Sequence, residues 1–321
     1  MLRLADHWVW DSWTVFDGSH HHLFFLRASR ALLDPDRRHL RASIGHARST
    51  DLRSWELLPD ALVPADTGAW DDQANWTGCV VRADDGTWRM FYTGVSRSED
   101  GLVQRVGVAR SDDLVVWHRD PGPLLSADPR WYETLDQESW FDEAWRDPWV
   151  LRDPDGDGWH MLITARARDG DPAGRSVVGH AVSPDLEHWE VRPPLSAPAG
   201  FGQLEVNQVA VVDGLPVLVF SCWPQHLSAE RRESWQQGGV WVVPGESLLG
   251  PWDFSAATTF EHPSLYAARL VEDPENGWAL LGFRDTEDGR FVGEIPDPLP
   301  VVRVGRSLQL RHGTEHDRPS D

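Results

Sequence analysis

The chain has 321 residues, of which 40% are hydrophobic and 25% charged, so it is long enough for one large globular domain or two ordinary ones. Its formal net charge of −21 argues against nucleic acid and membrane surfaces as partners, because phosphate backbones and anionic lipids repel such a surface. No run of about 18 apolar residues occurs, so the sequence predicts no membrane-spanning helix.

The first residues contain no charged stretch followed by an apolar one, so we find no secretory signal and expect a cytoplasmic protein. The composition is also rich in turn formers and aromatics, with 27 Gly, 23 Pro and 19 Trp. Many turns and many aromatic residues favour an all-β protein with short strands.

Five segments along the chain have the pattern of a strand, a turn and a second strand. In each one, β-branched or aromatic residues flank a turn, most of them of the Asp–Gly or Asn–Gly type, which is a strong signal for a β-hairpin. In chain order the segments are "SWTVFDGSHHHLFFLRAS" (12–29), "GCVVRADDGTWRMFYTG" (78–94), "PWVLRDPDGDGWHMLITAR" (148–166), "NQVAVVDGLPVLVFSC" (207–222) and "ARLVEDPENGWALLGFRD" (268–285).

A second repeat lies between these hairpins, in "ARSTDLRSW" (47–55), "ARSDDLVVW" (109–117) and "AVSPDLEHW" (181–189). Each unit therefore holds two central strands, a third that ends near this element and a fourth that begins there. Four-stranded units repeated five times predict a single five-bladed β-propeller over residues 1–306, followed by a polar C-terminal tail over 307–321. A pair of β-sandwiches is the alternative, but it does not explain five matched hairpins.

The residues just before the five hairpins should converge, because the first strand of each blade lines the central channel of a propeller. Three of these blade starts carry an acid, namely Asp11, Asp147 and Glu205. The five blade starts read "VWDSW" (9–13), "NWTG" (75–78), "WRDP" (145–148), "QLEVN" (203–207) and "LYAA" (265–268).

Carboxylates that are forced together raise the pKa of one member, which yields a proton donor beside ionised neighbours. Hydrolysis of a glycosidic bond needs this asymmetry, so a carbohydrate substrate is predicted. The alternative for each acid alone is a turn residue or a solvated cap at a strand start. Tryptophans should gather at the same rim, where their flat faces suit sugar rings, and those nearest the acids are Trp8, Trp10, Trp13, Trp76 and Trp145.

These motifs resemble two families of glycoside hydrolases in clan J. "VWDSW" looks like the nucleophile motif of family 68, the levansucrases, and a related motif stands there in family 32, the invertases and fructanases. "NWTG" resembles their Trp/Phe-Ser-Gly motif, "WRDP" matches their Arg-Asp-Pro motif, and "LEVN" falls where both carry an acid/base glutamate. Both families are five-bladed propellers, and the resemblance covers most of the chain.

The resemblance implies a role for each matched residue. Asp11 would be the nucleophile that forms a covalent fructosyl-enzyme, Glu205 would be the acid/base, and Asp147 with Arg146 would hold the furanose hydroxyls. The implied enzyme is a retaining hydrolase or fructosyl-transferring enzyme on β-D-fructofuranosides such as sucrose or fructo-oligosaccharides, without a metal or another cofactor. The sugar pocket would be shaped by Trp10, Trp13, Trp76 and Thr77.

The chain departs from both families at several positions. Family 32 usually has Asn and Cys where this chain has Trp10 and Val206, family 68 usually has Arg in place of Val206, and Thr77 replaces the usual Ser. The C-terminal β-sandwich typical of family 32 is also missing from the sequence. These departures leave the substrate open. One alternative is an inverting enzyme of the family 43 type on arabinofuranosides or xylosides, and another is a non-catalytic sugar-binding propeller.

Three other segments and two single histidines are also candidates for a functional role. "DPDGDG" (153–158) is spaced like a calcium loop but lacks its final Glu, so we interpret it as a turn, and "HHH" (20–22) as a solvated hairpin tip. The acidic segment 136–147 is expected to form a loop over the pocket, with Glu138 and Asp142 as spare carboxylates, or else a solvated loop. Two histidines in loops, His226 and His262, could reach the rim.

Overall fold

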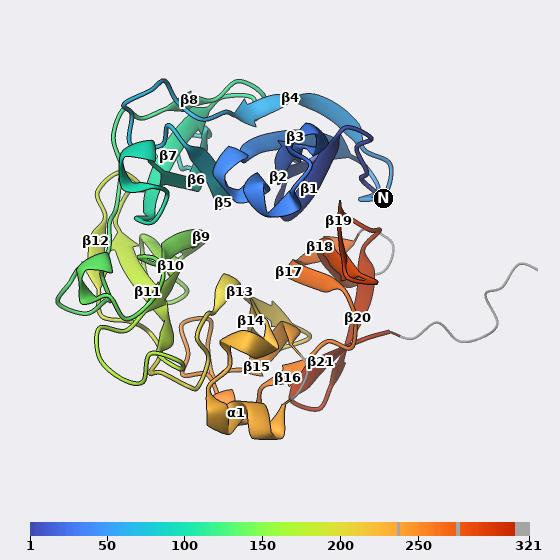
Figure 1. The fold of residues 1–321 in the computed structure, drawn as a ribbon. Helices are drawn as coiled ribbons and strands as arrows, with labels where there is room; N and C mark the ends of the chain where they lie inside the picture. The colour runs from blue at the N-terminus through green and yellow to red at the C-terminus, as the bar shows by residue number, and fades with distance from the viewer. Residues whose placement is uncertain (236–237, 274–276, 312–321) are drawn as a thin grey trace, which may run out of the picture.

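Five antiparallel sheets form a ring around a central channel in the computed structural model of the protein, which describes residues 1–235, 238–273 and 277–311 (Figure 1). Each sheet contains consecutive strands, with the first strand of each set nearest the channel. The predicted five-bladed β-propeller is therefore confirmed, and each predicted hairpin supplies the two inner strands of one blade.

The strand boundaries follow the repeat along the chain. The first blade contains β1 (His7–Phe16), β2 (His21–Ser29), β3 (Ser43–Ser49) and β4 (Glu56–Leu62). The second contains β5 (Ala74–Arg82), β6 (Trp88–Val95), β7 (Arg105–Ser111) and β8 (His118–Arg119), and the third β9 (Trp145–Arg152), β10 (Trp159–Arg166), β11 (Ser176–Ser183) and β12 (Glu190–Arg192). The fourth contains β13 (Glu205–Val212), β14 (Leu215–Cys222), β15 (Gly239–Pro244) and β16 (Thr258–Thr259). The fifth contains β17 (Leu265–Asp273), β18 (Gly277–Glu287), β19 (Arg290–Glu294), β20 (Leu299–Val304) and β21 (Ser307–Leu310).

Helical segments are short and lie in the connections between strands. Within the described residues, no helix has the length and apolar character that crossing a membrane requires. These segments are α1 (Ala229–Ser234) and the 3-10 turns η1 (Arg30–Leu32), η2 (Pro35–Arg41), η3 (Arg97–Glu99), η4 (Leu135–Gln137), η5 (Pro224–His226) and η6 (Phe254–Ala256).

The repeated Asp-Leu-x-x-Trp element forms the turn between the third and fourth strands of the first three blades. In the third blade the Asp185 carboxylate accepts hydrogen bonds from the backbone N–H groups of Glu187 and His188. Leu186 adopts a φ of 68° and is buried, and the indole N–H of Trp189 donates to the Leu186 carbonyl at 3.0 Å. The motif recurs because each of its three defined side chains has a role in the same turn. The Asp accepts backbone hydrogen bonds, the Leu is buried, and the Trp donates a hydrogen bond to the Leu carbonyl.

A β-bulge interrupts the innermost strand of every blade at the same level. The ladder shifts between Trp10 and Ser12 in β1, and at equivalent places in β5, β9, β13 and β17. A bulge leaves one residue unpaired and turns its side chain away from the regular alternation. Non-glycine residues with positive φ mark four of these bulges, with values of 27° at Asp11, 56° at Asp147, 53° at Val206 and 44° at Ala267.

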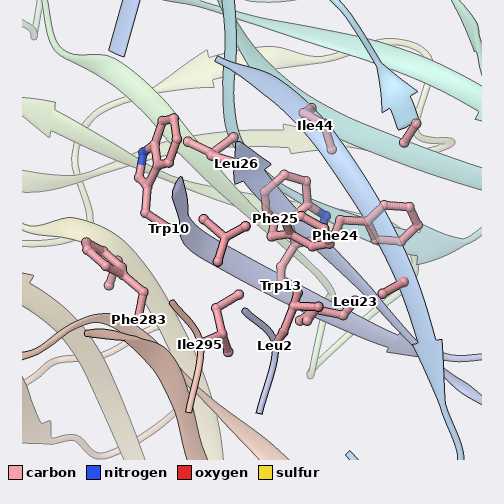
Figure 2. Close-up of a cluster of buried hydrophobic side chains, with 14 of the residues drawn as sticks. Leu2, Trp10, Trp13, Leu23, Phe24, Phe25, Leu26, Ile44, Phe283 and Ile295 are labelled. Atoms are coloured by element: carbon pink, nitrogen blue, oxygen red, sulfur yellow. The ribbon is translucent and has the colours of Figure 1, made fainter. Parts of the chain in front are cut away.

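The ring closes where the N-terminus meets the fifth blade (Figure 1). Leu2 exchanges two backbone hydrogen bonds with Ile295, of 2.8 and 3.0 Å. Both side chains are buried in a core that also contains Trp13, Phe24 and their neighbours from the first blade (Figure 2). Residues from the two ends of the ring thus share one hydrophobic core.

The predicted polar tail begins later than residue 307. Ser307–Leu310 pairs with β20 as strand β21, and Leu308 is fully buried against the fourth and fifth blades. The alternation of apolar Leu308 and Leu310 with polar neighbours explains this strand, because one face of it packs on the core. The rest of the predicted tail, from residue 312, lies outside the described residues.

Because Ile295 belongs to the shared core at the closure, shortening it should destabilise the whole ring. We predict that Ile295→Ala lowers the free energy of unfolding by about 2–5 kcal/mol, through lost burial and the cavity it leaves. Urea unfolding followed by tryptophan fluorescence measures the change. The exposed Val304, shortened to Ala, is the matched control and should change stability little. An equal effect of both variants would show that the closure does not carry the stability of the ring.

Candidate active site

A cavity of about 470 Å³ is lined by residues from all five blades. Asp11 comes from the first blade, Thr77 from the second, Asp147 from the third, Glu205 from the fourth and Tyr266 from the fifth. The three acids that the sequence predicts to converge do meet in this one cavity. They lie at the bulges of strands β1 and β9 and at the first residue of β13.

Asp11 lies at the bulge of β1, where its carboxylate accepts a hydrogen bond of 2.5 Å from the hydroxyl of Thr77 in the next blade. Burial raises the pKa of Asp11 to about 7, and the nearby carboxylates of Asp147 and Glu205 add to this effect. The Thr77 hydrogen bond and the Arg38 guanidinium act in the opposite direction. Asp11 therefore changes charge near neutral pH.

Asp147 is almost completely buried, and its carboxylate is held from three sides. Its Oδ2 accepts hydrogen bonds from the Thr164 hydroxyl at 3.0 Å and from the backbone N–H of Val206 at 3.1 Å. The guanidinium of Arg146 lies 3.6 Å away. Burial raises the pKa of Asp147, and Arg146 opposes that shift. The side chain is thus fixed in direction before any ligand binds.

Glu205 is partly accessible, with 21% of its side chain exposed. Its Oε1 accepts a hydrogen bond of 2.9 Å from Arg146, and its Oε2 accepts one from the Tyr266 hydroxyl. Burial and the adjacent Glu205 raise the pKa of Tyr266, so its hydroxyl stays protonated and remains a donor. The Tyr266 ring is stacked in parallel on Trp223, with centroids 4.5 Å apart.

Arg146 connects these acids. Its guanidinium donates to Gln104 at 2.9 Å and to Gln203, and it lies 3.5 Å from the Asp142 carboxylate. Burial alone would lower the pKa of Arg146, but Asp142, Glu205 and Asp147 together raise it, so the side chain stays charged. One buried cation thus faces three carboxylates and fixes where each can lie.

The structure brings most of the predicted sugar-binding residues into the cavity, but not Trp13. Trp10, Trp76, Thr77 and Arg146 line its wall. Trp13 instead stacks on Phe24 in the hydrophobic core, apart from Trp10 (Figure 2), and it does not line the cavity. The bulge at Asp11 explains the error, since it breaks the alternation that would relate residues on either side of it.

Two other tryptophans that we expected at the rim are also core residues. Trp8 packs edge-on against Phe291, and Trp145 packs against Tyr132. Both are buried and neither lines the cavity.

Of the other residues predicted from the sequence, some line the cavity and others lie outside it. In the acidic segment, Asp142 is buried in the cavity wall and Glu138 is exposed, so the segment forms part of the pocket. His226 lines the cavity, whereas His262 accepts backbone hydrogen bonds outside it.

The histidine run at residues 20–22 is not a solvated hairpin tip, because His21 and His22 are buried in β2. Residues 153–158 form the expected turn.

Several wall residues carried no signal in the sequence. Arg38 and Leu40 come from turn η2, and Trp223 from the end of β14, where no repeated pattern marks them. The cavity wall as a whole carries six carboxylates and two guanidiniums. They belong to Asp11, Asp100, Asp142, Asp147, Glu205 and Asp285, and to Arg38 and Arg146.

The site has the parts that acid/base chemistry at a sugar requires. An acid that titrates near neutrality, a fixed buried acid and an accessible acid face one cavity, with flat tryptophan rings in its wall. A nucleophilic carboxylate and a proton-donating carboxyl on the two sides of a bond are the minimum for cleaving a glycosidic linkage.

A model of one protein family matches residues 12–289 of the chain, and its description is "Glycosyl hydrolases family 32 N-terminal domain". The match covers four of the five blade starts in full and begins one residue after Asp11 in the first.

Individual relatives agree with this match, and one solved structure has the same fold. The chain is 28% identical over 289 residues to a sucrose-6-phosphate hydrolase of Zymomonas mobilis subsp. mobilis, covering 83% of this chain but 51% of that protein. It therefore spans about half the length of that relative. An extracellular sucrase of the same organism is 25% identical, with 94% of this chain and 81% of the sucrase covered. The structure of inulosucrase from Halalkalicoccus jeotgali bound to kestose superposes with a TM-score of 0.79, at 22% identity, over 100% of this chain and 94% of that one.

The raised pKa of Asp11 has a consequence for stability. Below pH 3.8, the ordinary value, both folded and unfolded chains hold the proton, but between 3.8 and about 7 only the folded chain does. Ionising Asp11 therefore costs stability as the pH rises through this window. We predict that Asp11→Asn stabilises the protein at pH 8 by about 1–4 kcal/mol and leaves it unchanged at pH 4.

Thermal unfolding of both proteins at the two pH values measures this difference. Asp185→Asn is the control of opposite sign, because backbone hydrogen bonds from His188 and Glu187 lower the pKa of Asp185. That variant should lose stability at pH 8. If Asp11→Asn is no more stable than the unchanged protein at pH 8, ionisation of Asp11 does not lower the free energy of unfolding.

Proposed function

The chain belongs to glycosyl hydrolase family 32, and from that premise we propose that it is a retaining β-fructofuranosidase that acts on sucrose or short fructo-oligosaccharides. The observation that carries the proposal is the meeting of Asp11, Asp147 and Glu205, from three separate blades, in one cavity around Arg146. The names of the relatives, a sucrose-6-phosphate hydrolase and a sucrase, support the same substrate class.

Asp11 would be the nucleophile. Its ionised carboxylate attacks the anomeric carbon of the fructosyl group, and the bond from that carbon to the leaving oxygen breaks. Glu205 would give its proton to this oxygen, so that the leaving sugar departs as a neutral alcohol. The Thr77 hydroxyl, 2.5 Å from Asp11, holds the nucleophile in place through a hydrogen bond to its Oδ2.

The second half of the reaction reverses these roles. Glu205, now ionised, takes a proton from water, and the oxygen of that water bonds to the anomeric carbon as the bond to Asp11 breaks. Two inversions at the same carbon give net retention. The accessibility of Glu205, whose side chain is 21% exposed, suits a group that must meet both the leaving sugar and water.

Asp147 and Arg146 would hold the sugar while this happens. Asp147 is anchored by Thr164 and the Val206 N–H, and so presents a fixed acceptor to sugar hydroxyls. Arg146 keeps its charge among three carboxylates and balances the charge that forms near them. The partly exposed ring of Trp76 in the wall offers a flat apolar face to the C–H bonds of a furanose, and Trp10, only 2% exposed, supports the wall from the core side.

The charge of the wall favours an uncharged substrate. Six carboxylates face two guanidiniums, so a phosphate group on the leaving sugar would enter a region of negative potential. Of these two sugars, we therefore expect sucrose to be the better substrate, although one relative is named for the phosphorylated sugar.

Substitution of the acids tests the chemistry. We predict that Asp11→Asn and Glu205→Gln each lower kcat on sucrose by about a thousandfold or more, because each removes one half of the nucleophile and acid/base pair. Release of glucose, followed by a coupled assay, measures the loss. Asp153→Asn, in the turn at the far end of β9, is the control and should keep normal activity.

Proton NMR in the first minutes of turnover identifies the anomer released. A β-fructofuranose product agrees with retention, whereas the α-anomer would mean direct attack by water and an inverting mechanism. Near-normal turnover by Asp11→Asn would remove Asp11 from the mechanism altogether.

Comparison of sucrose with sucrose 6-phosphate tests the charge argument. We predict that kcat/KM for the phosphorylated sugar is lower by about tenfold or more at low ionic strength, and that added salt narrows the gap through screening. Asp285→Asn, which removes one negative charge from the wall, should narrow the gap without salt. A preference for sucrose 6-phosphate would contradict the assignment and indicate a phosphate-binding group that the wall charges do not reveal.

A further inference from the structure

Three exposed apolar side chains lie together on the cavity wall. They are Leu40, Leu102 and Phe141, with exposed fractions of 36%, 39% and 58%, and we call them the apolar rim. They come from three segments far apart in the sequence, namely turn η2, the residues after η3, and the loop before β9. Single exposed apolar residues are common on protein surfaces, but a contiguous group at a cavity marks a surface that binds something.

The segments of the apolar rim are tied to one another. The backbone N–H of Glu143 donates to the Leu102 carbonyl at 2.8 Å, which fixes the Phe141 loop beside Leu102. Leu40 lies against Gly101, because a Cβ added to that glycine would be 2.8 Å from Leu40 Cδ2. The three side chains therefore lie on neighbouring segments of one cavity wall.

Phe141 is supported from beneath. Its ring lies against Trp140, with centroids 5.0 Å apart, and the guanidinium of Arg166 lies 3.7 Å from the centre of the Trp140 ring. Arg166 is itself buried and bonded to Glu133 and to the Gly202 carbonyl. An aromatic ring held on such a base and still more than half exposed is preorganised for contact with a ligand.

We propose that the apolar rim binds the leaving group of the substrate, and that this protein prefers β-D-fructofuranosides whose leaving group has an apolar face, such as an alkyl or aryl alcohol. The occupant follows from continuity, because the apolar rim and the three acids line the same cavity. This inference rests on the proposed fructosidase function, since it names the other part of that substrate.

Charge and shape agree with this occupant. The carboxylates of the wall disfavour an anionic leaving group, and the apolar rim offers no hydrogen bonds from its side chains to the many hydroxyls of a sugar. When a hydrocarbon surface packs against Leu40, Leu102 and Phe141, the apolar surfaces of both the ligand and the protein are removed from water. Full burial of each methylene group raises affinity by about fourfold.

A pair of alkyl glycosides tests the proposal. Methyl and hexyl β-D-fructofuranoside have alcohols of similar acidity as leaving groups, so a difference between them reports contacts of the longer chain. We expect kcat/KM for the hexyl compound to exceed that for the methyl compound by about tenfold or more. In the double variant Leu102→Ser/Phe141→Ser, the ratio should fall to near one.

Phe16→Ser is the matched control, because Phe16 is an aromatic residue of similar exposure, 52%, that does not line the cavity. It should leave the ratio of the two glycosides unchanged. A ratio near one in the unchanged protein, or a ratio that the double variant does not alter, would overturn the proposal. So would a change of oligomeric state in the double variant, measured by sedimentation, since the apolar rim would then be a contact between copies of the chain.

Calorimetric binding of both glycosides to Asp11→Asn gives the comparison without turnover. The hexyl compound could bind more tightly, in a way that depends on the apolar rim, while the unchanged protein hydrolyses neither glycoside. That result would reject the fructosidase function and keep the binding surface. Hydrolysis of both glycosides with equal binding would reject the binding surface and keep the fructosidase function.

Discussion

The buried guanidinium of Arg146 is the interaction on which the pocket depends. It faces Asp142, Asp147 and Glu205, and its own position is fixed by Gln104 and Gln203. Without a cation there, the carboxylates would repel one another in a region where water screens them poorly. The arrangement joins two blades, because Asp142 and Asp147 lie just before and on β9 with Arg146, whereas Glu205 lies on β13.

The β-bulges change the direction of side chains on the innermost strands, at the level of the site. Positive φ in residues other than glycine costs about 1–3 kcal/mol each, and it persists only where the surrounding structure supports it. That support is visible in hydrogen bonds that join neighbouring blades at the bulges. The Thr93 hydroxyl donates to the Thr77 carbonyl and accepts from the Asp147 N–H, so it joins the bulges of β5 and β9.

The same pattern continues around the channel. Gln208 of β13 exchanges two hydrogen bonds with the backbone of Leu270 in β17, and Arg269 donates across the channel to the Gly78 carbonyl at 2.6 Å. Together with the hydrogen bond from Thr77 to Asp11, these contacts connect the innermost part of all five blades.

The fold and the three acids could be predicted from the sequence, because both depend on signals that repeat. Turn chemistry and alternation mark five hairpins, and the acids of "WDS", "RDP" and "LEV" stand shortly before three of them. Trp13 could not be assigned in this way, because the bulge at Asp11 reverses the face on which the next residues lie. Phe141, Asp142 and Trp223 come from irregular segments with no period to follow, so only their spatial neighbours reveal their place in the wall.

This difference in origin separates chemistry from selectivity in the molecule. The acids and Arg146 lie on the innermost strands, where ladder hydrogen bonds and bulges fix their direction. Leu40, Leu102 and Phe141 lie on connections between strands, which tolerate substitution because few other contacts depend on them. A change in a connection can alter which leaving group fits without moving Asp11 or Glu205. In the proposed reaction, the strands therefore set which bond is broken, and the connections set which leaving group fits.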